Sequence, residues 1–380
     1  MVWLYAGFIV FILVMLALDL FVVNRKPHEI SIRAAVFWTG ICVVLSLIFS
    51  FVVFQMYQHD FHGVGTAMRE RSALLITSQA DLPEMRPGEV HTPPVRKPDM
   101  SEHDYEQSLK SFEEATRVLG LSDNKIAWQA TLEYLSGWLI EYSLSLDNIF
   151  VIAIIFAHFA IPKQYQHRVL FWGILGALVM RGVMIALGAV LIAQFQWVLY
   201  VFGAFLIFTA FKLLRDNSSE PTPEEGIVYR LARKVFPFHP TLDGQKFFVR
   251  KDGRLWMTPL FLVLLIVEGT DVVFAVDSIP AIFSITQDPF LVFTSNVFAI
   301  LGLRSLYFAL AAMMDKFRFL KLSLAFILAF VGVKMILVFW HIHLGAPLSL
   351  IIIVLALAAG VAASLLLPPK HPPASSPAPN

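Results

Sequence analysis

Two matching acidic segments lie inside long hydrophobic stretches of this sequence. One runs from Glu141 to Asn148 and the other from Asp271 to Ser278. In each, five residues separate an acidic residue from an Asp that is followed by a small polar residue, and Glu268 comes one helical turn before the second. A carboxylate in hydrocarbon costs roughly 2.5–3.5 kcal/mol even on a lenient insertion scale. The two segments therefore indicate a site that binds something positive.

The side chains of these segments define the chemistry of the predicted site. They offer only oxygen donors, and neither motif contains Cys or His. Hard oxygen sites suit Mg²⁺, Ca²⁺ or Mn²⁺, whereas Zn²⁺ and Cu⁺ favour sulfur or imidazole. A divalent ion fits better than a monovalent one, because several carboxylates would otherwise stay unneutralised. The candidate metal ligands are Glu141, Asp147, Asn148, Glu268, Asp271, Asp277 and Ser278.

Helical spacing limits which of these ligands can converge. Residues seven apart, such as Glu141 and Asn148, share a helix face. Asp147 and Asp277 instead lie about 120° from the acidic residues six positions before them. A single cage therefore requires a broken helix or ligands that face different neighbours. Pro280 removes a helical hydrogen bond and predicts a break in the second segment only.

Arg181 and Arg304 fall near the middle of their hydrophobic stretches and are the expected counter-charges. Two interpretations stay open. They form static ion pairs that hold parts of the protein together, or they keep the empty site's carboxylates ionised and switch partners during transport. Protons compete for the same carboxylates, so cation/proton exchange is a hypothesis. No permanently bound cofactor is expected.

The composition indicates a polytopic membrane protein. Of 380 residues, 57% are hydrophobic and 15% charged, against about 25% charged in a soluble domain. A net charge of +1 without a basic block gives no indication of nucleic acid binding, and the single Cys42 excludes an intrachain disulfide. A spanning helix needs about 20 mainly apolar residues. We predict an all-α fold with about nine transmembrane helices: 3–23, 33–54, 132–160, 169–192, 197–214, 258–285, 291–313, 322–340 and 347–367.

The short connections between these spans predict their orientation. Lys and Arg are frequent after the first, third, fifth and seventh spans and nearly absent after the fourth, sixth and eighth. Because Lys and Arg concentrate on the cytoplasmic side, we expect the N-terminus outside and the C-terminus in the cytoplasm, with the chain in the inner (plasma) membrane.

The spans and loops divide the chain into seven predicted parts. Within the outer insertion, 101–119 predicts an amphipathic helix, and 247–256 in the inner loop predicts a β-hairpin that turns at Asp-Gly. The parts are two N-terminal spans (1–54), an extracytoplasmic insertion (55–131), a first three-helix repeat (132–214), a cytoplasmic loop (215–257), a second three-helix repeat (258–340), a ninth span (341–367) and a disordered tail (368–380).

The two three-helix units share more than the acidic segments. The stretch 174–181 parallels 300–304, both ending in Arg, and 208–212 parallels 330–334, both ending in Lys. Three spans are an odd number, so the two copies must cross the membrane in opposite directions. Inverted repeats with a site near the membrane midplane are a recurring design of secondary transporters.

With these motifs identified, the chain resembles the TerC family of integral membrane proteins, in particular its Alx-like branch. The resemblance rests on 141–150, 267–281 and 294–304, and on the inner segment 247–253. It implies a manganese exporter whose intramembrane acidic residues carry the ion, and historically a label of tellurium resistance. The outer insertion 55–131 is longer than expected for the family, which leaves room for a protein partner there.

Three functions from different classes follow as hypotheses. The first is a transporter that exports a divalent cation, with Mn²⁺ as the expected ion. The second is a membrane assembly or insertion factor that acts through its extracytoplasmic loop. A membrane enzyme is not expected, because no nucleophile–base constellation or substrate-binding motif is present.

Overall fold

The computed structural model describes residues 2–18, 32–79, 94, 101–120, 122–195, 197–215, 227–235, 237–239, 241–251, 254–310, 319–337 and 344–366. This part of the chain forms two compact units. One unit combines Met1–Met15 with Leu45–Leu135, and the other combines Leu16–Val44 with Ser136–Asn380. The predicted tail, 368–380, lies outside the described residues, and the other predicted part boundaries stay predictions.

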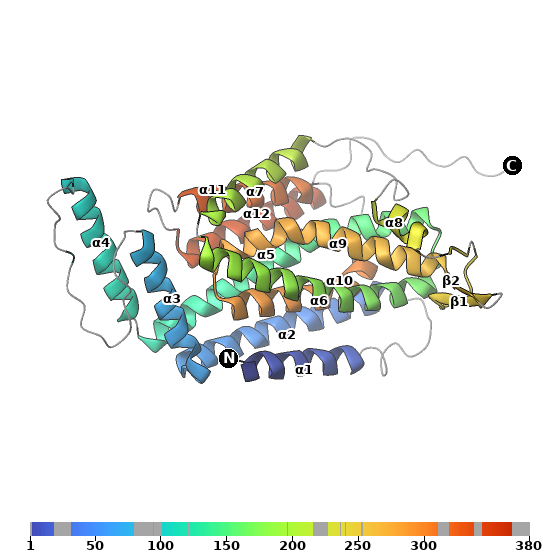
Figure 1. Ribbon diagram of the computed structural model, residues 1–380, viewed down its shortest axis with the longest axis horizontal. Helices are drawn as coiled ribbons and strands as arrows, with labels where there is room; N and C mark the ends of the chain where they lie inside the picture. The colour runs from blue at the N-terminus through green and yellow to red at the C-terminus, as the bar shows by residue number, and fades with distance from the viewer. Residues whose placement is uncertain are drawn as a thin grey trace. The chain divides into compact units, whose positions relative to one another are not determined.

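The described residues are mainly helical (Figure 1). Twelve α-helices, one short 3₁₀ helix and a two-stranded hairpin follow one another along the chain. They are α1 (Val2–Leu18), α2 (Ile32–Gln58), η2 (Phe61–Gly63), α3 (Val64–Gln79), α4 (Glu102–Leu119), α5 (Asp123–His158), α6 (Lys163–Gln194), α7 (Val198–Arg215), α8 (Ile227–Val235), β1 (Phe248–Lys251), β2 (Arg254–Met257), α9 (Pro259–Phe283), α10 (Pro289–Leu310), α11 (Leu320–Leu337) and α12 (Ala346–Leu366).

Each of the nine predicted spans coincides with a helix. Among the described residues, seven helices are long and apolar enough to cross a membrane: α2, α5, α6, α7, α9, α10 and α12. The shorter apolar helix Trp3–Leu16 and helix α11 cover the other two stretches. The polytopic helical class is therefore confirmed, while the count of nine and the inverted repeat stay predictions.

Helix α6 shows why this fold suits a membrane. Its side chains Val179 and Leu187 are 60% and 66% exposed, whereas Arg181 is only 2% exposed. A soluble helix would place its charge outward and its apolar residues inward. The outer face of α6 is suited to lipid, and its polar chemistry is directed into the protein.

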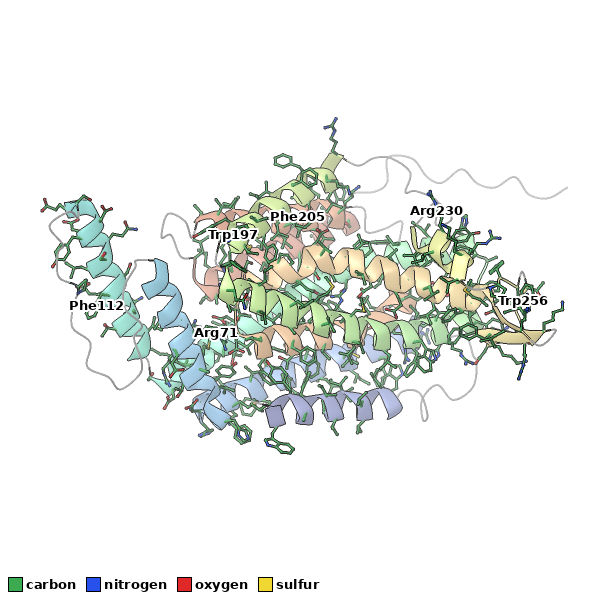
Figure 2. All side chains as sticks on the ribbon, viewed as in Figure 1. Arg71, Phe112, Trp197, Phe205, Arg230 and Trp256 are labelled. Atoms are coloured by element: carbon green, nitrogen blue, oxygen red, sulfur yellow. The ribbon has the colours of Figure 1, made fainter. Side chains whose placement is uncertain are left out.

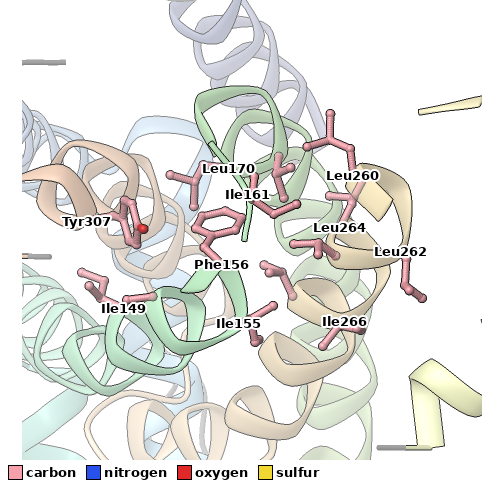
Figure 3. Close-up of a cluster of buried hydrophobic side chains, with 14 of the residues drawn as sticks. Ile149, Ile155, Phe156, Ile161, Leu170, Leu260, Leu262, Leu264, Ile266 and Tyr307 are labelled. Atoms are coloured by element: carbon pink, nitrogen blue, oxygen red, sulfur yellow. The ribbon is translucent and has the colours of Figure 1, made fainter. Parts of the chain in front are cut away.

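In the second unit, α6 packs against α9 and α10, and α7 packs against α11 and α9. Figure 3 shows a buried apolar cluster to which α5, α6, α9 and α10 all contribute, including Phe156, Leu170, Leu264 and Tyr307. This cluster fixes the four helices that carry most of the predicted site residues.

Helices α7 and α11 approach each other through glycines. A Cβ on Gly203 would lie 2.9 Å from the carbonyl oxygen of Gly332, and a Cβ on Gly332 would lie 2.7 Å from that of Gly203. Small residues at such crossings let backbones pack closely in membrane proteins.

The predicted hairpin is confirmed as β1 and β2, an antiparallel pair in which Phe248 is opposite Met257. Its Asp-Gly turn lies outside the described residues. Figure 2 places Trp197, which precedes α7, near one end of the second unit, and Arg230 and Trp256 near the other.

The predicted amphipathic helix of the outer insertion is confirmed as α4. Ser101 caps its N-terminus by accepting a hydrogen bond from the Asp104 backbone N–H at 3.1 Å. In the same unit Asp60 holds the start of α3, because its carboxylate accepts bonds from the Thr66 N–H at 2.8 Å and the Thr66 hydroxyl at 2.6 Å. Burial raises the pKa of Asp60. The two bonds from Thr66, a hydrogen bond from the Gly65 backbone and the charge of Arg69 outweigh burial, so the pKa is lowered overall.

The predicted helix break at Pro280 is wrong. Helix α9 continues through Pro280 and ends at Phe283. Pro280 lies in the last turn of the helix, so the bond that it removes is one of few that remain before the helix ends. Helix α5 is likewise a single helix from Asp123 to His158. The acidic residues are therefore positioned by regular helices and face different neighbours.

Candidate intramembrane cation site

Arg181 on α6 is the centre of the candidate site. Its Nε donates to Asp271 Oδ2 at 3.0 Å and its Nη2 donates to Asp271 Oδ1 at 2.8 Å. Its Nη1 forms an ion pair with Oε1 of Glu141 on α5. The side chains of Arg181 and Glu141 are 2% and 1% exposed, and that of Asp271 is 15% exposed. One guanidinium thus neutralises two carboxylates in the protein interior.

This arrangement joins the two predicted three-helix repeats. Glu141 and Arg181 belong to the first and Asp271 to the second. Asn148 lies on the same face of α5 as Glu141, and its Nδ2 donates a hydrogen bond to Asp271 Oδ1 at 3.4 Å. Glu141 and Asp271 hold equivalent positions in the two acidic segments, and they meet at the same arginine. Two-point Arg–carboxylate pairing fixes orientation as well as charge.

A cavity opens beside this ion pair. Its volume is about 40 Å³, against roughly 10–15 Å³ needed for one water. Its polar walls are Glu268, Asp271, Arg304 and Tyr307, and the remaining walls are apolar residues of α5, α6, α9 and α10. The cavity has room for a partly hydrated ion next to two carboxylates.

Glu268 fits against α6 only because residue 176 is glycine. A Cβ added to Gly176 would overlap the carboxylate of Glu268. The two cavity carboxylates, Glu268 and Asp271, are three residues apart on α9 and share a face. Arg304, 7% exposed, faces the same cavity from α10.

Asp277 faces another helix. Its Oδ1 accepts a hydrogen bond from the Thr209 hydroxyl of α7 at 3.2 Å. Ser278 is 2% exposed, and its hydroxyl has no hydrogen-bond partner among the described residues. Asp271 and Asp277 therefore point from one helix toward different partners, as their six-residue spacing requires.

The predicted ligands are thus only partly brought together. Glu141, Asn148 and Asp271 meet at Arg181, Glu268 lies beside Asp271, and Asp277 and Ser278 lie farther along α9. The side chain of Asp147 lies outside the described set. Among the described residues, no group of three or more His, Cys, Asp or Glu side chains is arranged to hold a metal ion.

Sequence reasoning missed Gly176, Thr209 and Tyr307. A signal was present for Thr209, which lies in the segment 208–212 that recurs at 330–334. Gly176 also lies in a recurring segment, since the Ile-Leu-Gly of 174–176 returns at 300–302. Its contact with Glu268 depends on which side chain of α9 reaches it, and the sequence does not reveal this.

The comparisons with known proteins identify a family of membrane proteins. The family model of the integral membrane protein TerC family matches residues 126–371. No solved structure matches the chain.

Two of the curated relatives described here match nearly the whole length, and a third matches the larger part. An uncharacterized membrane protein of Myxococcus xanthus, STKORF319, is 40% identical over 372 residues, which are 98% of this chain and 94% of the relative. The candidate membrane-bound redox modulator Alx of Escherichia coli (strain K12) is 38% identical over 350 residues, 92% of this chain and 90% of that protein. An uncharacterized membrane protein of Rickettsia bellii is 46% identical over 237 residues, covering 62% of this chain and 78% of the relative.

Proposed function

Since the chain belongs to the TerC family of integral membrane proteins, we propose that it is a transporter that exports a divalent cation, Mn²⁺ foremost, through the carboxylates around Arg181. The observation that supports this most is the sharing of one buried arginine between Glu141 and Asp271. A structural ion pair needs one carboxylate. Two carboxylates from opposite repeats, next to a cavity with a third, form a place where a divalent charge can replace a guanidinium.

The residues have different roles in this scheme. Glu268 and Asp271 line the cavity and receive the cation. Arg181 releases Asp271 as the cation binds, and it neutralises the pair again when the cation leaves. Such a partner exchange keeps the carboxylates compensated throughout, because uncompensated buried charge is costly. A proton on Glu268 would complete the exchange, so export in exchange for protons is part of the proposal.

The ligand chemistry favours manganese over softer metals. Among the polar side chains that line the cavity, Glu268, Asp271 and Tyr307 offer oxygen atoms, Arg304 offers a guanidinium, and none offers a thiol or imidazole. Oxygen ligands favour Mg²⁺, Ca²⁺ and Mn²⁺ over Zn²⁺ and Cu⁺. The choice of Mn²⁺ among the hard ions comes from the family resemblance.

The test is the manganese content of cells that carry variants. Asp271→Asn leaves Arg181 without its two-point partner and removes a cavity carboxylate, so cells that express it should accumulate Mn²⁺ above the wild-type level. Asp288→Asn is the matched control. Asp288 is also a buried acid, but it accepts the Phe290 N–H at 2.9 Å near the start of α10, a role that Asn can fill.

Normal export by a folded Asp271→Asn protein would show that the carboxylates around Arg181 are not the transport site. A rise in every divalent ion, instead of manganese, would show leakage. The chain would then not be a selective exporter.

We also propose that the N-terminus lies outside the inner (plasma) membrane and the C-terminus in the cytoplasm. The alternation of Lys and Arg supports this orientation. A fluorescent protein that matures only in the cytoplasm, fused after residue 367, should fluoresce. A dark but full-length fusion would reverse the topology.

A further inference from the structure

Asn296 on α10 is a fully buried amide. It is 0% exposed, and neither its Oδ1 nor its Nδ2 has a hydrogen-bond partner among the described residues. Buried polar side chains are nearly always paired with protein or with ordered water. What satisfies Asn296 therefore lies outside the described residues, and a water molecule or an ion can fill that role.

The position of Asn296 on α10 follows from its helical neighbours. Ile300, one turn later, lines the cavity with Asp271. Val292, one turn earlier, belongs to an apolar cluster that α6, α9 and α10 form together. Asn296 therefore lies on the face of α10 that is directed at α6 and α9, just beyond the cavity.

Arg181 occupies the same place on α6. Ala177, one turn before it, lines the cavity, and Ile185, one turn after it, belongs to the same apolar cluster as Val292. Asn296 and Arg181 thus face the same layer of the interior, yet the hydrogen bonds of Arg181 described above go to Asp271 and not to Asn296.

Two further oxygen atoms near this layer are buried and lack a hydrogen-bond partner in the described structure. They are Oε2 of Glu141 and Oγ of Ser278. Ser278 shares a face of α9 with Asp271 because the two are seven apart. Gly137, one turn before Glu141, packs against both Ser295 and Ile282, which brings α5, α10 and α9 together at this depth.

We propose that Asn296, with Ser278 and Glu141, forms a second, inner position for a hard divalent cation, reached from the cavity past Arg181. This inference rests on the proposed transport function and deepens it. Oxygen atoms of amide, hydroxyl and carboxylate groups are the ligands that Mn²⁺, Ca²⁺ and Mg²⁺ prefer. With a single carboxylate, the inner position holds the ion more weakly than the cavity and allows it to leave on the far side.

The test measures Mn²⁺ flux into proteoliposomes that contain the full-length chain, as a function of Mn²⁺ concentration. Asn296→Leu keeps nearly the same volume and removes both orphaned polar atoms, and such a replacement is often neutral for stability. The cavity still captures the ion, so KM should change less than threefold, whereas kcat should fall at least tenfold. Thermal unfolding should show a Tm no lower than that of the wild type.

Two variants make the result specific. Asn296→Asp keeps an oxygen ligand and should retain at least half of the wild-type kcat. Ser295→Ala, the neighbouring control, removes a buried hydroxyl that already donates to the Val292 carbonyl at 3.1 Å, and should leave flux within twofold. If Asn296→Leu fails to fold, Ser278→Ala carries the test, and its kcat should fall at least threefold.

Wild-type flux in Asn296→Leu would overturn the inner position, as would an equal loss in Asn296→Asp. Failure of the proposed function is distinct. In that case the wild type and Asp271→Asn would both match empty liposomes, and the inner position would fall with it.

Discussion

At the scale of single residues, Arg181 decides how the acidic pair can exist in a membrane. Sequence reasoning identified Glu141, Asp271 and Arg181 as opposite charges in hydrocarbon, because carboxylates at membrane depth require compensation. It left open which arginine pairs with which acid. That choice depends on side-chain reach between helices α5, α6 and α9, which no spacing within one helix reveals.

Replacing Arg181 should show how far the buried acids Glu141 and Asp271 depend on its charge. Arg181→Gln leaves Glu141 and Asp271 buried without their shared cation, and breaking a buried pair costs about 3–5 kcal/mol. We expect a lower Tm in detergent, and we expect Mn²⁺ to restore part of the loss, because a ligand at 100 times its Kd stabilises by about 2.7 kcal/mol.

The control is Arg168→Gln. The guanidinium of Arg168 lies 4.9 Å from the centre of the Phe247 ring, away from the acidic pair, so its removal should change Tm little and leave the Mn²⁺ effect unaltered. An Arg181→Gln protein that Mn²⁺ stabilises no more than the wild type would show that the cation does not take the place of the guanidinium.

Gly176 offers a second test at this scale. Gly176→Ala would force the Glu268 carboxylate out of its place in the cavity wall, so we expect the KM for Mn²⁺ to rise about tenfold with little loss of Tm. The double variant Gly176→Ala, Glu268→Asp has a shorter acid, so its KM for Mn²⁺ should return part of the way to the wild-type value.

Gly182→Ala is the matched control on the same helix, because its new Cβ would meet only the Phe293 ring at 3.5 Å, an ordinary contact. Equal KM values for Gly176→Ala and Gly182→Ala would show that Glu268 does not take part in cation capture.

At the scale of elements, the sequence predicted the helices well and their faces in part. Apolar runs located the nine predicted helices, and six-residue spacing correctly placed Asp277 away from Asp271. The proline rule failed at Pro280, because the cost of a missing N–H depends on how much helix follows. Three residues remain after Pro280, so the local signal overstated the effect.

The crossing of α7 and α11 was also beyond sequence reasoning, although it yields a prediction. Gly332→Ala would place a Cβ 2.7 Å from the Gly203 carbonyl oxygen, and a backbone atom cannot move aside as a flexible side chain does. Overpacking of this kind costs about 1–3 kcal/mol, so we expect a lower Tm by thermal unfolding.

Gly40→Ala serves as the reference for that substitution, since its Cβ would meet nothing within 4 Å, and it should be neutral or slightly stabilising. If Gly332→Ala is as stable as Gly40→Ala, close backbone contact does not hold α7 against α11.

At the scale of the whole molecule, the membrane class could be predicted because it follows from composition alone, whereas the placement of the parts could not. Apolar runs, charge alternation and the Asp-Gly turn are local or additive features. The role of the insertion 55–131 follows from no feature of that kind. It comprises η2, α3 and α4, and α3 packs against α4 in the same compact unit.

Replacing residues 60–122 by a short Gly/Ser linker separates a transporter from an assembly factor. The ends of the cut are close, because α2 and α5 run side by side in this unit: the rings of Phe54 and Trp128 are 5.1 Å apart, and the hydroxyls of Ser46 and Tyr134 lie 2.9 Å from each other. A flexible linker of a few residues can therefore join α2 to α5.

The shortened protein keeps Glu141, Arg181, Asp271 and the whole cavity, so an autonomous transporter should retain at least half of its Mn²⁺ flux in proteoliposomes. Its Tm should report an intact second unit. A folded, shortened protein without flux would assign the transport step to the outer insertion as well. Normal flux in vesicles combined with loss of function in cells would instead assign a partner-binding role to α3 and α4, because only the cell supplies the partner.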